Sequence, residues 1–206
     1  MLGNTEGKKT CLMNTKRARE ARKLEIGERQ KEVIMGSLLG DAHLVRTTYG
    51  FAFRVNHGIV QKDYVDWKYK EIESLTNSSP KTYKNSYYFR TVSHPFFEIL
   101  RKAFYRRRRK IVPKILEEWM TPLALSVWIM DDGSRDGNQV RINSQCFSKR
   151  ENKELIRIFK ATLGIKATLN RDKDMFRLRI ADSSMTKLKK MVEPFIVPSM
   201  RYKFSP

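Results

Sequence analysis

The chain has 206 residues, of which 42 are Lys or Arg and 22 are Asp or Glu, so its formal net charge is +20. This excess favours a polyanionic partner, nucleic acid first and an anionic membrane second, with a basic ribosomal or chromatin-type protein as the plain alternative. No apolar run reaches roughly 18 residues, so we expect no membrane partner. The two cysteines, Cys11 and Cys146, form no disulfide framework and suit a reducing compartment.

The first 30 residues are polar and strongly basic. We interpret residues 1–30 as a basic N-terminal arm that becomes partly helical from Asn14 onward and follows phosphates. A disordered solubilising tail is the alternative. The stretch lacks an apolar secretory segment, and its scattered glutamates argue against an organelle transit peptide.

The next stretch alternates helical and strand patterns. A mostly uncharged helix is expected over residues 32–39, followed directly by Gly40 and Asp41. Apolar spacing then predicts strand 51–56, helix 64–75, strand 83–92 and helix 96–104. A dense basic run closes this part of the chain, and we expect Arg106 to Arg109 to contact phosphates.

The same order of elements then repeats. Thr121 and Pro122 open a second apolar helix, with Thr121 as N-cap and Pro122 at the first helical position. This helix ends in Asp131, Asp132 and Gly133. The elements expected after it are strand 139–143, a helix capped by Ser148 that reaches about residue 163, strand 176–180 and helix 184–191.

Near-constant offsets between the two parts indicate an internal duplication. Asp132 follows Asp41 by 91 residues, Asn143 follows Asn56 by 87, and Arg179 follows Arg90 by 89. A repeat that occurs only twice is no solenoid, which leaves a two-fold pseudodimer. We therefore predict an α+β fold of two pseudo-symmetric αββαββα halves, residues 31–118 and 119–206, packed through the two apolar helices.

The two apolar helices both end in acid, which is unusual because a helix C-terminus already carries partial negative charge. If the helices pack side by side, Asp41 and Asp132 converge, and two such carboxylates repel unless one is protonated or a cation lies between them. An ordinary surface acid or N-cap is the weaker interpretation. The pattern predicts a divalent-metal site made from both halves.

At this point the chain resembles the LAGLIDADG homing endonucleases, in their single-chain, two-motif, intron-encoded form, over about residues 31–206. Gly36 and Gly40 stand where the family's motif keeps small residues, and Asp41 and Asp132 stand at its acidic position. The segments 120–123 and 128–133 are similar to the intron-encoded members found in organelles. The tail, residues 196–203, resembles the end of the same proteins.

The chain departs from the motif at three positions. Ala42 replaces the closing glycine of the first motif. Val127 and Asp131 fill usually small positions of the second helix, so Gly36 and Gly40 are expected to provide most of the close contact. Motif register favours Asp132 over Asp131 as the acidic ligand.

The resemblance implies phosphodiester hydrolysis with divalent ions shared by carboxylates and phosphate oxygens. Asp41 and Asp132 are the expected metal ligands and catalytic acids, with the carbonyls of Gly40 and Asp131 adding to the shell. Mg²⁺ is the expected ion, because it uses few protein carboxylates, and Mn²⁺ or Ca²⁺ can substitute in binding.

Two lysines and two further polar residues complete the expected site. The resemblance places Lys110 and Lys203 at the active site, where they stabilise developing negative charge or hold the attacking water; plain phosphate contact is the alternative. His57 and Gln145 follow the inner strands and can reach the site through water, with a structural or DNA-facing role as the alternative for His57. His43 and His94 are interpreted as structural.

The strands are expected to form a saddle of antiparallel sheets that reads double-stranded DNA. A twisted ribbon fits the major groove, where Arg reads guanine and Asn or Gln reads adenine. The strands show almost no acid at outward positions. The expected DNA contacts are Arg46, Arg54, Asn56, Lys81, Lys84, Tyr88, Arg90, Arg135, Gln139, Arg141, Asn143, Asn170, Arg171, Lys173, Arg177 and Arg179.

The resulting hypothesis is a site-specific homing endonuclease. It makes a double-strand break with short 3′ overhangs in a long asymmetric DNA target and so promotes intron mobility. An intron RNA maturase on the same scaffold is the alternative, with intron RNA as partner, and a DNA-binding regulator without catalysis is the third reading. A monomer is expected, in an organelle (mitochondrion or chloroplast) or in a prokaryotic cytoplasm.

Overall fold

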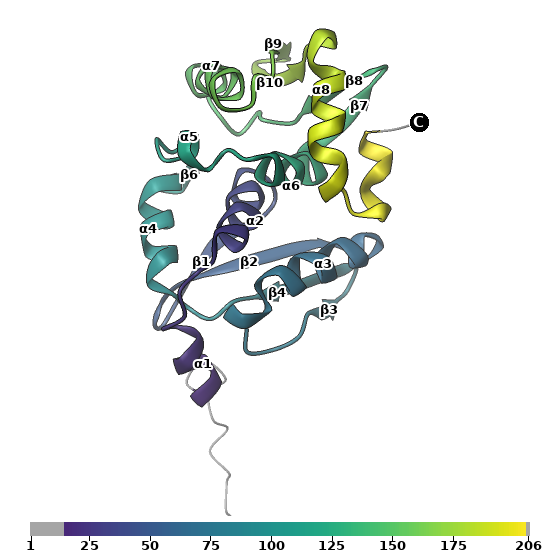
Figure 1. Ribbon diagram of the computed structural model, residues 1–206. Coiled ribbons are helices and arrows are strands. Elements are labelled where there is room, and N and C mark those ends of the chain that lie inside the picture. Colours follow the sequence, from purple (N-terminus) through teal and green to yellow (C-terminus); the bar gives the residue numbers. More distant parts are fainter. Residues whose placement is uncertain (1–14, 205–206) are drawn as a thin grey trace, which may run out of the picture.

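Two helices at the centre of the molecule, α2 (Glu28–Leu39) and α6 (Pro122–Asp132), join two similar halves. The computed structural model describes residues 15–204. Each half adds a four-stranded antiparallel sheet to its central helix, and the halves lie on either side of the helix pair (Figure 1). The predicted α+β class is confirmed.

The first half follows the expected order of helix, hairpin, helix, hairpin and helix. Its sheet has the strand order β1-β2-β4-β3. The elements after α2 are β1 (His43–Thr47), β2 (Gly50–Gly58), α3 (Lys62–Ile72), β3 (Lys81–Tyr83), β4 (Ser86–Arg90) and α4 (Pro95–Phe104).

The second half repeats this topology. Its sheet has the equivalent strand order β7-β8-β10-β9. The elements after α6 are β7 (Gly133–Asp136), β8 (Gln139–Ile142), α7 (Lys149–Ile158), β9 (Ala167–Asp172), β10 (Met175–Ile180) and α8 (Asp182–Val192).

Short segments connect and flank the halves. A small hairpin and one helical turn link α4 to α6, a π-helical turn extends α7, and four 3₁₀ turns follow β2, α3 and α8. These segments are β5 (Tyr105–Arg106), β6 (Arg109–Lys110), α5 (Leu116–Trp119), Phe159–Leu163, Ile59–Gln61, Glu73–Leu75, Glu193–Phe195 and Pro198–Lys203.

Two predicted helix starts are present with their capping bonds. The Thr121 hydroxyl accepts a hydrogen bond from the Ala124 amide, and Pro122 is the first residue of α6. Ser148 and Glu151 form a capping box at the start of α7. Such caps satisfy amide groups that a helix cannot satisfy itself, and this fixes where each helix begins.

Glycines on α2 allow the central helices to touch. A Cβ atom built on Gly36 would lie 2.3 Å from the carbonyl oxygen of Ala124 and 2.7 Å from the Cβ of Val127. One built on Gly40 would lie 2.5 Å from the Cβ of Asp131. The close approach expected from the motif therefore comes from the α2 side.

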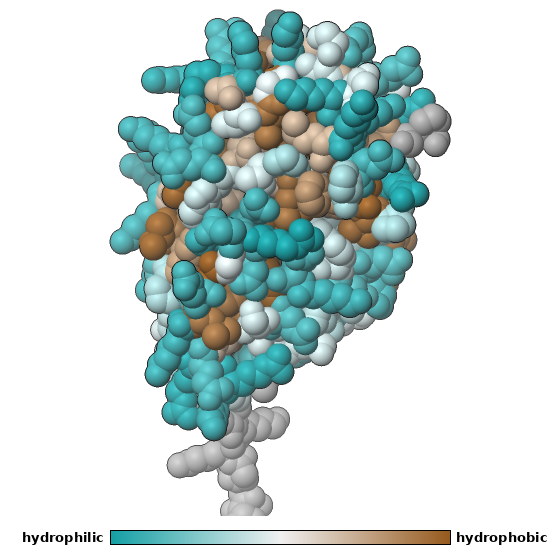
Figure 2. Space-filling view, viewed as in Figure 1, coloured by the Kyte–Doolittle hydropathy of each residue, from teal (hydrophilic) through white to brown (hydrophobic). Residues whose placement is uncertain are grey.

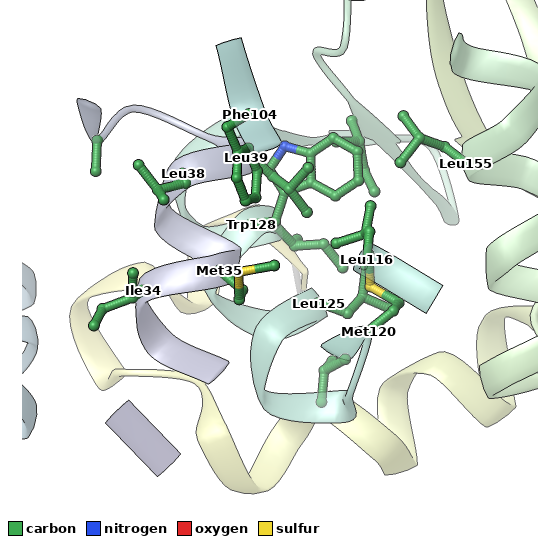
Figure 3. Packing of buried hydrophobic residues seen from close by; sticks show 14 of the residues in the cluster. Ile34, Met35, Leu38, Leu39, Phe104, Leu116, Met120, Leu125, Trp128 and Leu155 are labelled. Carbon is green, nitrogen blue, oxygen red and sulfur yellow. The ribbon is translucent and has the colours of Figure 1, made fainter. Parts of the chain in front are cut away.

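The core runs continuously through both halves. Met35 and Leu39 of α2 and Leu125 and Trp128 of α6 belong to one buried cluster, which Figure 3 shows around the Trp128 indole. Residues 123–131 of α6 are all buried. A helix that is apolar on every side needs partners on every side, so α6 depends on both halves.

The described part of the predicted N-terminal arm is attached to the first half. Its helix is present as α1 (Lys16–Ala21), but Ala18 and Ala21 are buried against Val92 instead of projecting into solvent. Residues 1–14 of the arm lie outside the described residues.

The surface of the described chain agrees with its composition. In Figure 2, hydrophilic residues cover most of the outer part of one face, and apolar residues gather toward its middle. Among the helices of residues 15–204, none is both long and apolar enough to cross a bilayer.

Replacing Gly36 by Ala is expected to lower the free energy of unfolding by about 1–3 kcal/mol, because the added Cβ meets rigid backbone. Alanine normally favours a helix over glycine by roughly 1 kcal/mol, so the sign of the change in unfolding free energy shows which effect is larger. Urea denaturation measures this change. Gly27→Ala is the control, because nothing lies within 4 Å of a Cβ there. A Gly36→Ala protein as stable as wild type would contradict the close contact.

Candidate active site and nucleic-acid interface

The C-terminal ends of α2 and α6 meet at the two motif acids. The Asp41 amide donates a hydrogen bond to Oδ2 of Asp131, at 3.2 Å across the helix pair. Asp41 has a half-exposed side chain, whereas Asp132 is largely buried and accepts a bond from the Trp128 indole at 3.1 Å. Burial, with the nearby charges of Asp41 and Asp131, raises the pKa of Asp132 to about 7. The acids are therefore close enough to repel each other.

The two predicted lysines bind the backbone beside these acids. Lys110 Nζ donates to the carbonyl oxygens of Gly40, at 2.6 Å, and Ala42, at 2.8 Å. Lys203 Nζ donates to the carbonyl oxygen of Asp131, the counterpart of Gly40. Burial lowers the pKa of both lysines. The two ammonium groups thus bind equivalent backbone carbonyls in the two halves.

The side chain of Asp131 is buried and binds three other residues. Its Oδ1 accepts hydrogen bonds from the Tyr64 hydroxyl at 2.8 Å and from Lys68 Nζ at 2.6 Å, and its Oδ2 accepts the Asp41 amide. The side chains of Lys68 and Asp131 are both 0% exposed. With both oxygens bonded and its charge offset by Lys68, this carboxylate is not a free cation ligand.

Sequence reasoning missed Tyr64 and Lys68. A signal was present, because Tyr64, Lys68 and Ile72 are spaced by four residues on the inward face of α3. A lysine at an inward helical position requires a buried anion, and Asp131 was the unexplained acid of the second motif.

His57 lies beside the acids on the core side of β2. Its Nδ1 is 3.0 Å from the Gln61 Oε1 and 3.6 Å from Asp41 Oδ2, and its Nε2 has no hydrogen-bond partner within residues 15–204. Burial and the nearby Lys68 lower the pKa of His57, which favours the neutral ring. Possible ligand atoms of Asp41, His57 and Asp131 lie within 4.8 Å of one another, but Lys68 already neutralises one of them.

His94 and Gln145 each bind another part of the chain. His94 is the N-cap of α4, and its Nε2 lies 2.9 Å from the carbonyl oxygen of Leu24, which agrees with a structural role. Gln145 donates to Oδ2 of Asp172 at 2.8 Å instead of approaching the motif acids.

Strand register gathers most of the predicted recognition residues on one face of each sheet. Arg54 pairs with Arg90, and Asn56 pairs with Tyr88. Arg141 pairs with Arg179 in the second half. Alternation along the strands adds the other members of these outward faces, so that the saddle residues are Arg54, Asn56, Lys81, Tyr88, Arg90, Gln139, Arg141, Asn143, Asn170, Arg177 and Arg179.

Three predicted DNA contacts have the opposite strand parity to the saddle residues, and their contact with DNA stays a prediction. Register pairs Arg46 with Phe51, Arg135 with Val140 and Arg171 with Phe176, and all three arginines are exposed. The guanidinium of Arg46 stacks 5.3 Å from the centre of the Phe51 ring. These positions were chosen by residue type, and side chains that alternate along a strand place every second one away from the saddle.

The predicted turn and loop cations have mixed environments. Lys84 and Lys173 are exposed at hairpin turns with φ values of +52° and +55°. In the basic run, the Arg109 guanidinium binds the Glu151 carboxylate through two hydrogen bonds, at 2.8 and 3.1 Å. Arg109 therefore ties the β5–β6 hairpin to α7 of the other half, and the expectation that all four arginines serve phosphates is wrong for this one.

Replacing Lys68 by Met is expected to lower the free energy of unfolding by about 3–5 kcal/mol, because it leaves the Asp131 carboxylate buried without a cation. Adding Asp131→Asn should recover part of that loss. Chemical denaturation measures both variants, with the exposed Lys70→Met on the same helix as control. Equal stabilities of the Lys68 and Lys70 variants would show that the buried pair is unimportant.

The contribution of Asp132 to the stability of the metal-free protein is expected to fall as pH rises from about 4 to about 7. Unfolded Asp132 ionises near its ordinary pKa of about 4, whereas the folded group stays protonated up to about 7. The gain in melting temperature from Asp132→Asn should therefore widen over this range and level off above it. The control is Asp182→Asn at the outer end of α8. A difference in melting temperature between Asp132→Asn and wild type that does not change with pH would refute the raised pKa.

Comparison with known proteins agrees with this geometry. The profile of the LAGLIDADG DNA endonuclease family matches residues 31–188. DNA endonuclease I-ChuI of Chlamydomonas applanata is 26% identical over 88% of this chain and 97% of its own length. The cytochrome b mRNA maturase bI2 of Saccharomyces cerevisiae is 28% identical over 83% of this chain, which spans 46% of that protein.

A solved structure has the same fold. The homing endonuclease I-WcaI, bound to its DNA recognition sequence, superposes with a TM-score of 0.84 at 23% identity, covering 93% of each chain. The profile match covers most of the sequence, and the duplicated topology and the paired helix-end acids agree with it. The chain belongs to the LAGLIDADG DNA endonuclease family.

Proposed function

We propose that this chain is a site-specific endonuclease that breaks both strands of a long asymmetric DNA target, leaves short 3′ overhangs and promotes intron mobility. The observation that carries the proposal is the meeting of Asp41 and Asp132 at the junction of two basic sheets with the same topology. One acid per half matches one phosphodiester per strand. The different residues of the two halves match an asymmetric site.

The acid cluster fits a divalent cation. Burial raises the pKa of Asp132, and the nearby Asp41 and Asp131 raise it further. A cation between Asp132 and Asp41 would relieve the charge repulsion. The carbonyl oxygens of Gly40 and Asp131 each accept a lysine and keep a second lone pair for such an ion. A bound Mg²⁺ would polarise the phosphate and lower the pKa of the attacking water.

The chain's own residues then orient the reaction. Lys110 and Lys203 bring positive charge to both sides of the junction, where each can stabilise negative charge that develops on a phosphate oxygen. The Asp131 carboxylate accepts a hydrogen bond from the backbone amide of Asp41. This bond fixes Asp41 relative to Asp132 before DNA binds. His57, neutral and buried beside Asp41, helps to exclude solvent from the cluster.

The saddle residues supply recognition. Arginines read guanine and Asn or Gln side chains read adenine in the major groove, while the exposed Lys84 and Lys173 extend the contact to phosphates beyond the sheets. A single chain with two recognition surfaces needs no second copy, which supports a monomer on double-stranded DNA.

An RNA maturase is the second candidate. The similarity to a yeast protein named as an mRNA maturase favours it, and the same basic surface attracts RNA. Binding to intron RNA and to duplex DNA, measured on one preparation, distinguishes the two functions. Tight RNA binding without any cleaved duplex would favour the maturase.

Asp41→Asn and Asp132→Asn are each expected to reduce Mg²⁺-dependent cleavage by at least about 100-fold, because each removes a cation ligand. Binding of the uncleaved duplex should stay within about tenfold of wild type, a change of roughly 1.4 kcal/mol. The target is obtained by selection of cleaved duplexes from a library of intronless junctions, and cleavage is followed on a supercoiled plasmid that carries it.

Asp182→Asn is the matched control for these variants, and it should cleave like wild type. Loss of binding as large as the loss of cleavage would show the motif acids to be structural. Full cleavage by both motif variants would refute the assigned site.

A further inference from the structure

The outward faces of the two sheets differ in charge. In β1 to β4, register and alternation place His43, Arg54, Arg90 and Lys81 on the saddle face, with no acid among the strand residues described there. The equivalent face of the second sheet carries two acids, Asp136 on β7 and Asp172 on β9. The expectation of a nearly acid-free saddle is therefore wrong for this half.

Asp136 binds two arginines at once. Its Oδ1 pairs with the Arg141 guanidinium, and its Oδ2 lies 3.1 Å from a terminal nitrogen of Arg179. The three side chains are between 25% and 37% exposed, so the cluster is half sheltered from water. The hydrogen bond from Arg141 lowers the pKa of Asp136, which keeps the carboxylate charged at neutral pH.

The shared anion favours a close, ordered arrangement of the two arginines. Arg141 and Arg179 are direct partners on β8 and β10, and like charges at such positions repel. A carboxylate shared between them offsets that repulsion and fixes the planes of both guanidinium groups. Without it, the two long side chains would separate and follow the nearest phosphates.

Part of the hydrogen-bonding capacity of this cluster is unused. The Nε atoms of Arg141 and Arg179, and Oε1 of the neighbouring Gln139, are buried without a partner among the described residues. Each guanidinium has five N–H donors, and Asp136 takes only some of them. Two parallel donors directed at the same base are what recognition of guanine requires.

A negative charge here also has a cost in binding. Asp136 lies on a surface that faces phosphates, where a carboxylate weakens attraction to any DNA regardless of sequence. Salt bridges at exposed positions stabilise a fold only weakly, so stability is a weak reason for this acid. A group that lowers general affinity while ordering base-reading side chains raises the ratio of specific to non-specific binding.

We propose that Asp136 is a specificity-determining residue, which holds Arg141 and Arg179 in place to read guanines in the half-site bound by the second half and suppresses binding to unrelated DNA. This inference rests on the proposed function, because it needs a specific duplex target. It deepens that function by assigning sequence discrimination to an acid that repels phosphates.

The test compares Asp136→Asn with wild type on a duplex selected from a randomised library by the wild-type protein. Dissociation constants in Ca²⁺ are measured for every single-base variant of that duplex and for random-sequence DNA. The matched control is Glu117→Gln, which removes an arginine–carboxylate pair with Arg157 outside the saddle. Arg141→Ala and Arg179→Ala identify the base pairs that each arginine reads.

Asp136→Asn is expected to lose about tenfold discrimination at those base pairs, within one half-site only. Its affinity for random DNA should rise several-fold at low salt. In the Arg141→Ala, Arg179→Ala background, Asp136→Asn should have no further effect on discrimination, and Asp136→Glu should restore part of it in the otherwise native protein. Glu117→Gln should keep the wild-type profile.

Three outcomes would overturn the proposal. An unchanged discrimination profile in Asp136→Asn would refute it while leaving the endonuclease function intact. An equal loss in both half-sites, with a lower melting temperature, would show a structural role. Failure of wild type to select any duplex would refute the proposed function, and this inference with it.

Discussion

The contact between α2 and α6 is the constraint on which the rest of the structure depends. Gly36 and Gly40 let the helix backbones approach so closely that a single Cβ atom would collide with Ala124 or Asp131. This approach makes one core of two halves and brings two acidic helix ends together. Because each half contributes one helix, one sheet and one lysine, the same contact also aligns the two basic faces.

Adjacent acids in the second motif have opposite roles because their surroundings differ. Asp131 points into the N-terminal half, where Lys68 and Tyr64 bind it and make it part of the fold. Asp132 points to the junction, where burial and neighbouring carboxylates raise its pKa to about 7. One charge is thus neutralised inside the protein, and we propose that the other binds an external cation. The buried ion pair also links α3 of one half to α6 of the other.

Local patterns in the sequence predicted much of this arrangement. Near-constant offsets of about 90 residues revealed the duplication, Thr121 and Ser148 marked helix starts, and the family resemblance marked Gly36 and Gly40 as the helix contact. The helix caps and the small residues of the motif are each encoded within a few residues. The overall topology and the meeting of the motif acids followed from them.

Features that depend on pairing between distant segments were not predictable in the same way. Whether an arginine faces the saddle depends on strand register, which moves every side chain to the other face when it shifts by one residue. Arg46, Arg135 and Arg171 were grouped with the saddle residues by residue type, whereas register gives them the opposite parity. The bonds of Lys68 to Asp131 and of Arg109 to Glu151 join residues far apart in sequence, so residue type alone gave no partner.

We propose that Asp41 and Asp132 share a cation at the junction of the halves. Anomalous scattering from Mn²⁺, in crystals of the protein bound to its selected duplex, tests this arrangement. A peak is expected between these two carboxylates, within about 2.5 Å of an oxygen atom of each. A peak bound only by Asp131 and His57, or carboxylates of residues 41 and 132 that share no ion, would contradict it.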